Sequence, residues 1–201
     1  MGNVVPLNKP QECGLYLHMS GDVTLSELIV VLEMIQLPLF LVKEMPNFSM
    51  FTRDDKSFTQ DIDELLVRKY RSIQEDSRFF AKKGTHLGVM DVVCNEMDSL
   101  AVSDVRSTNS IDLMISSMSV AAIFGLQEYS LIKDIFLYVA SYVENRTQLA
   151  RKLVQEGPSN ETLKTPLINI SFSEREIAQL AKFKSVEIRT EGDDIFIKLK
   201  R

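Results

Sequence analysis

Residues 110–125 read SIDLMISSMSVAAIFG, and residues 126–144 continue as LQEYSLIKDIFLYVASYVE. This long apolar segment lies between a polar centre and a tail that is rich in β-forming residues. It predicts two helices, Ser110–Phe124 and Leu126–Lys152, separated by Gly125. Helices this apolar are stable in water only when another surface covers them. The segment therefore indicates that either the rest of the chain or a second chain packs on it.

The composition is that of an ordinary globular protein, with 201 residues, of which 45% are hydrophobic and 25% are charged. This length supplies one sizeable core or two small ones. The formal net charge is −5, and a field of that sign repels phosphate backbones. Nucleic-acid binding would therefore require a local cluster of basic residues.

Three features favour a cytoplasmic location. Two cysteines, Cys13 and Cys94, are too few for a disulfide framework and favour a reducing compartment. Residues 1–10 lack the charged region and the long apolar run of a signal peptide. The apolar segment Leu28–Val42 is interrupted by a glutamate and by Pro38, so it falls short of the roughly 20 apolar residues of a membrane span.

The N-terminal part is predicted to contain both strands and a helix. Thr24 and Glu27 have the spacing of a capping box, which indicates a helix from Leu25 to about Gln36. Because proline lacks the backbone N–H that a helix interior needs, Pro38 is expected to end this helix. The other predicted elements are an extended arm at residues 1–12, a strand at Gly14–Met19 and a short strand at Leu39–Val42.

The middle of the chain is predicted to be helical, and the tail to contain strands. Glu156 to Asn160 is rich in turn-forming residues and indicates a linker. A second capping box, Ser173 and Glu176, predicts a short helix through Ala181. The remaining predicted elements are helices at about Phe58–Phe80 and Val89–Leu100, a loop at Asp104–Ser110, a strand at Pro166–Phe172, and a hairpin of Ser185–Thr190 and Asp194–Leu199.

These elements predict an α+β fold, in which a bundle of about five helices packs with a small mixed or antiparallel sheet. The sheet is expected to combine the N-terminal strand with a C-terminal β-α-β-β unit. The predicted organisation is an arm at residues 1–12, a mainly helical core at 13–156, a linker at 157–165 and the β-α-β-β unit at 166–201, packed on the core.

Few residues suggest catalysis or cofactor binding. His18, His86, Cys13 and Cys94 are too dispersed for a structural zinc site, and the eight glycines form no phosphate-binding loop. We therefore expect no metal, no cofactor and no catalytic residue, and we favour a non-enzymatic protein. A hydrolase with an unfamiliar site near His86 is a minor alternative.

Positive charge concentrates in the C-terminal tail, which makes DNA binding the main alternative function. A capped helix followed by a β-hairpin is also how a winged-helix domain ends, but the second, groove-reading helix is missing. Acidic residues of the tail cancel most of the local charge. On this alternative, a transcription or replication regulator would use Arg175, Lys182, Lys184, Arg189, Lys198 and Lys200.

The leading prediction is a cytoplasmic adaptor, assembly factor or regulatory subunit that acts through protein–protein contacts or as a homo-oligomer. Strand edges and apolar helix faces are common contact elements, and methionines give a helix an adaptable surface. The arm, the apolar segment and the predicted edge strand at Asp194–Leu199 supply the candidates. We expect no membrane partner. The candidate contact residues are Val4, Val5, Leu7, Met114, Met118, Ile195 and Ile197.

Overall fold

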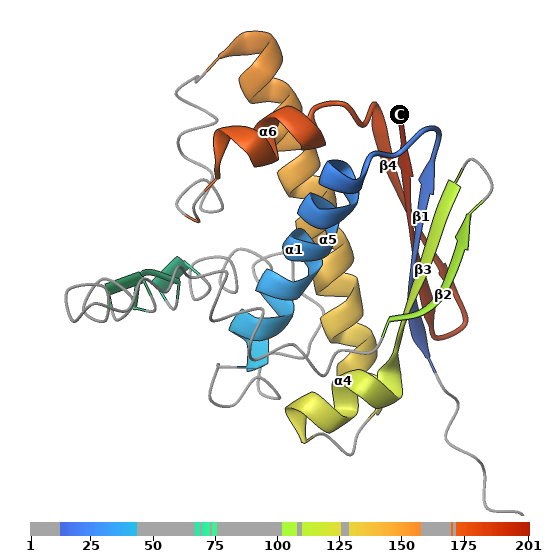
Figure 1. Ribbon diagram of the computed structural model, residues 1–201. Coiled ribbons are helices and arrows are strands. Elements are labelled where there is room, and N and C mark those ends of the chain that lie inside the picture. Colours follow the sequence, from blue (N-terminus) through green and yellow to red (C-terminus); the bar gives the residue numbers. More distant parts are fainter. Residues whose placement is uncertain are drawn as a thin grey trace, which may run out of the picture.

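The computed structural model describes residues 13–43, 67, 68, 70–72, 74, 75, 102–107, 110–125, 129–157, 170 and 172–201. Within these residues, helices lie against one face of a five-stranded sheet (Figure 1). The sheet contains both parallel and antiparallel pairs. The predicted α+β class with a mixed sheet is therefore confirmed.

The sheet joins strands from the beginning, the middle and the end of the chain. Its strands are β1 (Gly14–Ser20), β2 (Val102–Ser107), β3 (Ser110–Ser116), β4 (Ser185–Glu191) and β5 (Asp194–Lys200), in the order β2-β3-β1-β5-β4. The central pair, β1 and β5, is parallel, and the other pairs are antiparallel. The predicted C-terminal hairpin is confirmed, with Gly192 at a φ of 64° in its turn.

The first seven residues of the quoted apolar segment, Ser110–Ser116, form a strand, so the helix predicted for Ser110–Phe124 is wrong over those residues. Ile111, Leu113 and Ile115 occupy every second position, separated by Asp112 and Met114, and this period of two suits a strand. β3 pairs with β1 along its whole length. Ser116 then caps the shorter helix α4 (Ser117–Phe124) by accepting a hydrogen bond from the amide of Ser119. The loop predicted at Asp104–Ser110 is likewise replaced in part by β2.

The last strand is not at an edge of the sheet, which corrects a second prediction. β5 lies between β1 and β4, so its backbone is paired on both sides. The side chains of Ile195 and Ile197 are fully buried in the hydrophobic core. Both were predicted to contact a partner, but they pack inside this chain instead.

Helix α1 (Leu25–Lys43) continues through Pro38, so neither the predicted stop nor the predicted strand at Leu39–Val42 is present. An interior proline costs a helix roughly 3 kcal/mol. Here the residues on both sides of it, Leu37 and Leu39–Val42, are buried. Each such side chain gains about 1.5–3 kcal/mol from burial, which outweighs the lost hydrogen bond.

By length and composition alone, α1 passes the test for a membrane-crossing helix, with a mean hydropathy of 2.0 over an 18-residue window. However, 61% of that window is buried inside the fold. Figure 1 shows α1 beside α5 (Tyr129–Glu156), on the helical side of the sheet. A buried core helix explains the same hydropathy.

The N-terminus of α1 carries a fully buried carboxylate that joins three parts of the chain. Glu27 and Thr24 form the predicted capping box, with Glu27 Oε2 accepting hydrogen bonds from the amide (2.6 Å) and hydroxyl (2.9 Å) of Thr24. Glu27 Oε1 lies 3.3 Å from Nζ of Lys182 and 3.6 Å from Nη2 of Arg201. Burial by itself would raise the pKa of Glu27, but these hydrogen bonds and the charge of Arg201 outweigh it and lower the pKa.

Helix α5 supplies the largest part of the helical layer. Ile135, Phe136, Val139 and Val143 are fully buried on one side of it, as the helical spacing predicts. In the described residues, therefore, the chain itself covers the second half of the apolar segment. Gly157, at a φ of 74°, follows the last residue of α5 as a helix stop.

A buried arginine connects α5 to α6 (Glu174–Leu180). Arg146 is 0% exposed, pairs with Glu176 at 2.8 Å and donates to the carbonyl of Ile170 at 3.1 Å. Its guanidinium also lies 3.8 Å from the ring centroid of Phe172. Burial raises the pKa of Glu176, although the charge and hydrogen bond of Arg146 act in the opposite direction. The predicted cap of α6 is confirmed, because Ser173 accepts a hydrogen bond from the amide of Glu176.

Several predictions lie wholly or mostly outside the described residues. Within the helix predicted at Phe58–Phe80, residues 67, 68, 70–72, 74 and 75 are helical. Of the strand predicted at Pro166–Phe172, the structure describes Ile170 and Phe172, and neither is in a strand. The arm at residues 1–12, most of the linker at 157–165, the helix at Val89–Leu100 and His86 lie outside the described residues.

Candidate binding site on the open face of the sheet

The two faces of the sheet differ in what covers them. One face carries Leu15, Leu17, Ile195 and Ile197, all buried beneath the helices. On the opposite face, called the open face below, no helix of the described ranges is packed (Figure 1). The open face consists of the alternate side chains of the same strands. These are Tyr16, His18 and Ser20 of β1, Asp112 and Met114 of β3, Glu187 and Arg189 of β4, and Phe196, Lys198 and Lys200 of β5.

An aromatic pair lies at the centre of the open face. Tyr16 and Phe196 are neighbours in the register of β1 and β5, and their rings stack with centroids 4.7 Å apart and planes 12° apart. Gly14 makes room for this stack, because a Cβ at that position would lie 2.8 Å from Cε2 of Tyr16. Burial and the charge of Asp194 raise the pKa of Tyr16, so its hydroxyl stays protonated at neutral pH.

In the next row across the sheet, two basic side chains lie between two acidic ones. In register order it runs Asp112, His18, Lys198 and Glu187. Nδ1 of His18 lies 2.6 Å from Oδ1 of Asp112, and this hydrogen bond fixes the imidazole ring. The side chains of His18 and Asp112 remain 36% and 46% exposed, so the pair is accessible to a ligand.

Lys200 keeps Glu187 in its charged form. Lys200 donates a hydrogen bond to Oε1 of Glu187, and this contact is the main cause of the lowered pKa of Glu187. The charges of Arg189 and Lys198 act in the same direction. The negative charge of Glu187 is therefore neutralised mainly by Lys200. Arg189 and Lys198 contribute less to this neutralisation.

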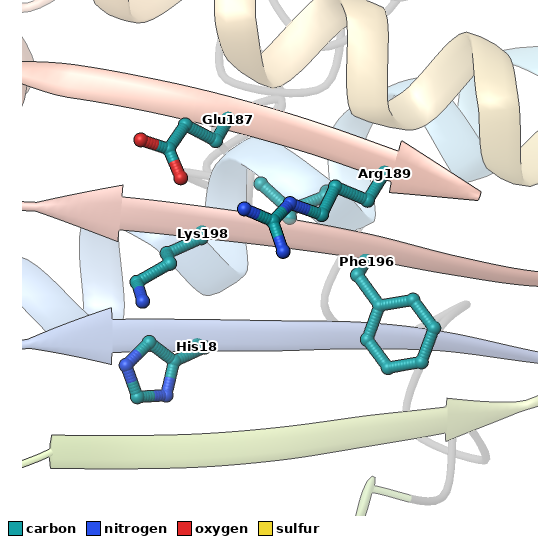
Figure 2. A pocket seen from close by; sticks show the side chains of 6 residues that line it. His18, Glu187, Arg189, Phe196 and Lys198 are labelled. Atoms are coloured by element: carbon teal, nitrogen blue, oxygen red, sulfur yellow. The ribbon is translucent and has the colours of Figure 1, made fainter. Parts of the chain in front are cut away.

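A shallow cavity of about 190 Å³ is lined by the side chains of His18, Glu187, Arg189, Phe196 and Lys198, and by Ile197, whose own side chain is buried on the covered face. Figure 2 shows that the labelled side chains come from three adjacent strands, with Arg189 extending from β4 toward β5 and Lys198 beside His18. Cavities that enclose a drug-sized ligand are usually about 300–1,000 Å³. This one is therefore large enough for one chemical group but not for a whole cofactor.

The predicted nucleic-acid contacts are divided among three places. Arg175 on α6 and Lys182 after it are exposed on the helical side, and Lys184 is exposed in the connection to β4. The remaining three contacts share the open face with acidic residues such as Asp112 and Glu187. These three are Arg189, Lys198 and Lys200.

The predicted partner contacts are also dispersed. Met114 lies beside Tyr16 on the open face and is half-buried, whereas Met118 is 54% exposed on α4. Val4, Val5 and Leu7 lie outside the described residues. Met118 is one of three large hydrophobic residues that are exposed in the described ranges, with Leu25 and Val154, and these belong to three different helices.

The central residues of the open face were not among the predicted site residues. Tyr16, Phe196 and Asp112 went unnoticed because each lies in a short apolar segment. The alternation of Leu15, Leu17 and Met19 with Tyr16 and His18 was a usable signal for a face of β1. The register that brings β5 beside β1 has no local signal in the sequence.

The groups around His18 and Cys13 can be compared with those that covalent or metal chemistry requires. His18 is oriented by Asp112, but in the described part of the chain no hydroxyl or thiol group is hydrogen-bonded to the imidazole. Cys13 lies on the covered side, where burial raises the pKa of its thiol and so disfavours the reactive thiolate. No group of three metal-ligating side chains was found among the described residues.

Comparison with protein-family models, with curated proteins and with solved structures gave no match for this chain.

Proposed function

We propose that this protein is a non-enzymatic intracellular adaptor or regulatory subunit that contacts a protein partner through the open face of its sheet. One observation carries the proposal. Helices cover one face, while on the other face a stacked aromatic pair, Tyr16 and Phe196, is surrounded by polar and charged side chains. Protein interfaces are commonly built in this way, with aromatic and arginine side chains at the centre and a polar rim.

The test compares two variants of the full chain. The first is Tyr16→Ala combined with Phe196→Ala, on the open face. The second is Leu25→Ala combined with Val154→Ala, which removes exposed apolar side chains from helices instead. A partner isolated with the wild-type protein is purified, and its Kd for each variant is measured by calorimetry.

We expect the open-face variant to bind at least 100-fold more weakly, because central aromatic residues often contribute 2 kcal/mol or more, roughly 30-fold, each. The helix variant should bind like the wild type. The opposite pattern would contradict the proposal. Light scattering adds a further arm, since a dimer that becomes monomeric in the open-face variant would identify the partner as a second copy of the chain.

DNA or RNA binding is a second proposal, supported by the presence of Arg189, Lys198 and Lys200 on one face. The acidic residues of the same face oppose it, as does the net charge of −5. Fluorescence polarisation with a labelled duplex and a labelled single strand at low salt tests it. Binding that weakens steeply with salt and is lost on neutralising these three residues would favour this second proposal over the first.

A further inference from the structure

The cavity on the open face brings nitrogen donors from three adjacent strands together. Arg189 comes from β4, Lys198 from β5 and His18 from β1. Figure 2 shows these three side chains projecting from the same side of the sheet. Arginine supplies a planar fork of N–H donors, and lysine supplies a compact positive charge. Side chains of these two types are the usual ligands of phosphate groups in proteins.

The charges around the cavity leave an excess of positive charge. Glu187 is paired with Lys200, and Asp112 is hydrogen-bonded to His18. Neither Arg189 nor Lys198 forms an ion pair with a carboxylate in the ranges that the structure describes. An anion that enters the cavity therefore meets two cations without displacing an existing ion pair.

The size of the cavity and the residues that line it limit which anions it can bind. About 190 Å³ is enough for a phosphate group and its ester link, and the half-open shape lets the rest of the ligand extend into solvent. A phosphate has several acceptor oxygens that point in different directions, which suits donors from three strands better than a planar carboxylate does. Phe196 gives one wall an apolar surface, against which a carbon-bearing substituent can pack.

We propose that this cavity binds a phosphate monoester, with Arg189 and Lys198 holding the phosphate and Phe196 contacting its substituent. Two sources share this chemistry: a small phosphorylated metabolite of the nucleotide type, or a phosphorylated side chain of a protein. The proposal goes beyond the protein partner of the previous subsection and does not depend on it, because a small phosphate ester can bind when no partner is present.

The experiment is an NMR titration of the full chain at low ionic strength with three probes: inorganic phosphate, AMP and a short phosphoserine peptide. Arg189→Gln and Lys198→Gln are each expected to weaken binding at least tenfold. Lys184→Gln is the matched control, because it removes the same charge from an exposed position outside the cavity. This control should bind like the wild type.

Glu187→Gln is expected to strengthen phosphate binding, whereas Arg189→Gln and Lys198→Gln weaken it. Removing the negative charge of Glu187 leaves Lys200 without its carboxylate partner and makes the cavity more positive, so binding should tighten several-fold. Tighter binding of AMP than of the peptide would identify the nucleotide source, and the reverse order would identify the phosphoprotein source. The proposal is overturned if no probe gives saturable shifts at the cavity, or if Lys184→Gln weakens binding as much as Arg189→Gln does.

Discussion

The two faces of the sheet are built from the same strands yet have opposite character. On β5, Ile197 is fully buried under the helices, and its neighbour Lys198 lines the cavity on the other side. On β1, Leu17 and His18 differ in the same way. Successive side chains of a strand point to opposite faces, so a step of one residue separates the core from the solvent-accessible surface. We infer that folding depends mainly on one face and its helical layer, and binding on the other.

The largest expected effect lies in the helical layer, at Arg146. Arg146→Met should lower the free energy of unfolding by about 3–5 kcal/mol, because it leaves Glu176, whose side chain is only 20% exposed, without its charge partner. Arg189→Met, which removes an exposed arginine of the open face, should change it by less than about 0.5 kcal/mol. Urea denaturation of both variants measures the difference.

A double variant sharpens this first prediction. Arg146→Met combined with Glu176→Leu removes both charges, and it should be more stable than Arg146→Met alone. If the double variant is the less stable of the two, an unpaired buried charge is not the reason for the loss.

The second prediction compares neighbouring residues on β5. Ile197→Ala should destabilise the fold by about 2–5 kcal/mol, since it creates a cavity in the core. Lys198→Ala should cost no more than about 0.5 kcal/mol. Thermal unfolding followed by circular dichroism measures both. Equal losses would mean that the open face is as important for folding as the covered face.

The third prediction concerns pH and the buried Glu27. Its pKa in the fold lies below its ordinary value of 4.5, so its stabilising effect is complete above pH 4.5 and is lost as the pH falls through the lowered pKa. Glu27→Gln keeps the capping box but removes the charge. At pH 7 it should destabilise the fold by about 1–2 kcal/mol, a discounted value because Lys182 and Arg201 are partly exposed.

The difference between wild type and Glu27→Gln should therefore shrink as the pH is lowered from 7 to 3. Urea denaturation across this range measures it, with Glu156→Gln as a control at an exposed helix end. A difference that stays constant with pH would show that the charge of Glu27 does not stabilise the fold.

The smallest expected effect is on the open face itself. A double-mutant cycle with Tyr16→Leu and Phe196→Leu should give a coupling free energy of about 0.5–1.5 kcal/mol, the usual contribution of a stacked aromatic pair. If this coupling free energy is larger than the one measured in the same way for a pair of core residues, the open face stabilises the fold as much as the covered face does. That result would contradict the assignment of folding to one face and binding to the other.

Local sequence patterns predicted the local structure well. The capping boxes at Thr24 and Ser173 begin helices, and the alternation after Ser185 forms a hairpin. These features depend on residues close together in the chain, so their chemistry is visible in a short window. The prediction of an α+β class was based on these local helices and strands taken together.

The errors arose where distant contacts outweighed local preference. Pro38 is a helix breaker by itself, but the burial of its neighbours keeps α1 intact. Ser110–Ser116 was read as helical because of its apolar content, and pairing with β1 makes it a strand. The candidate site could not be predicted for the same reason, since it depends on the register between β1 and β5.

The pairing of β1 with β5 also sets an order of events during protein synthesis. Leu15 pairs with Ile195, and these two residues are 195 − 15 = 180 positions apart in the sequence. At roughly 5–20 residues per second, a ribosome takes about 10–35 s to travel between them. Through that interval β1 and the apolar helix α1 lack the strand that completes their shared core. The nascent chain is therefore expected to need protection from aggregation until its last strand emerges.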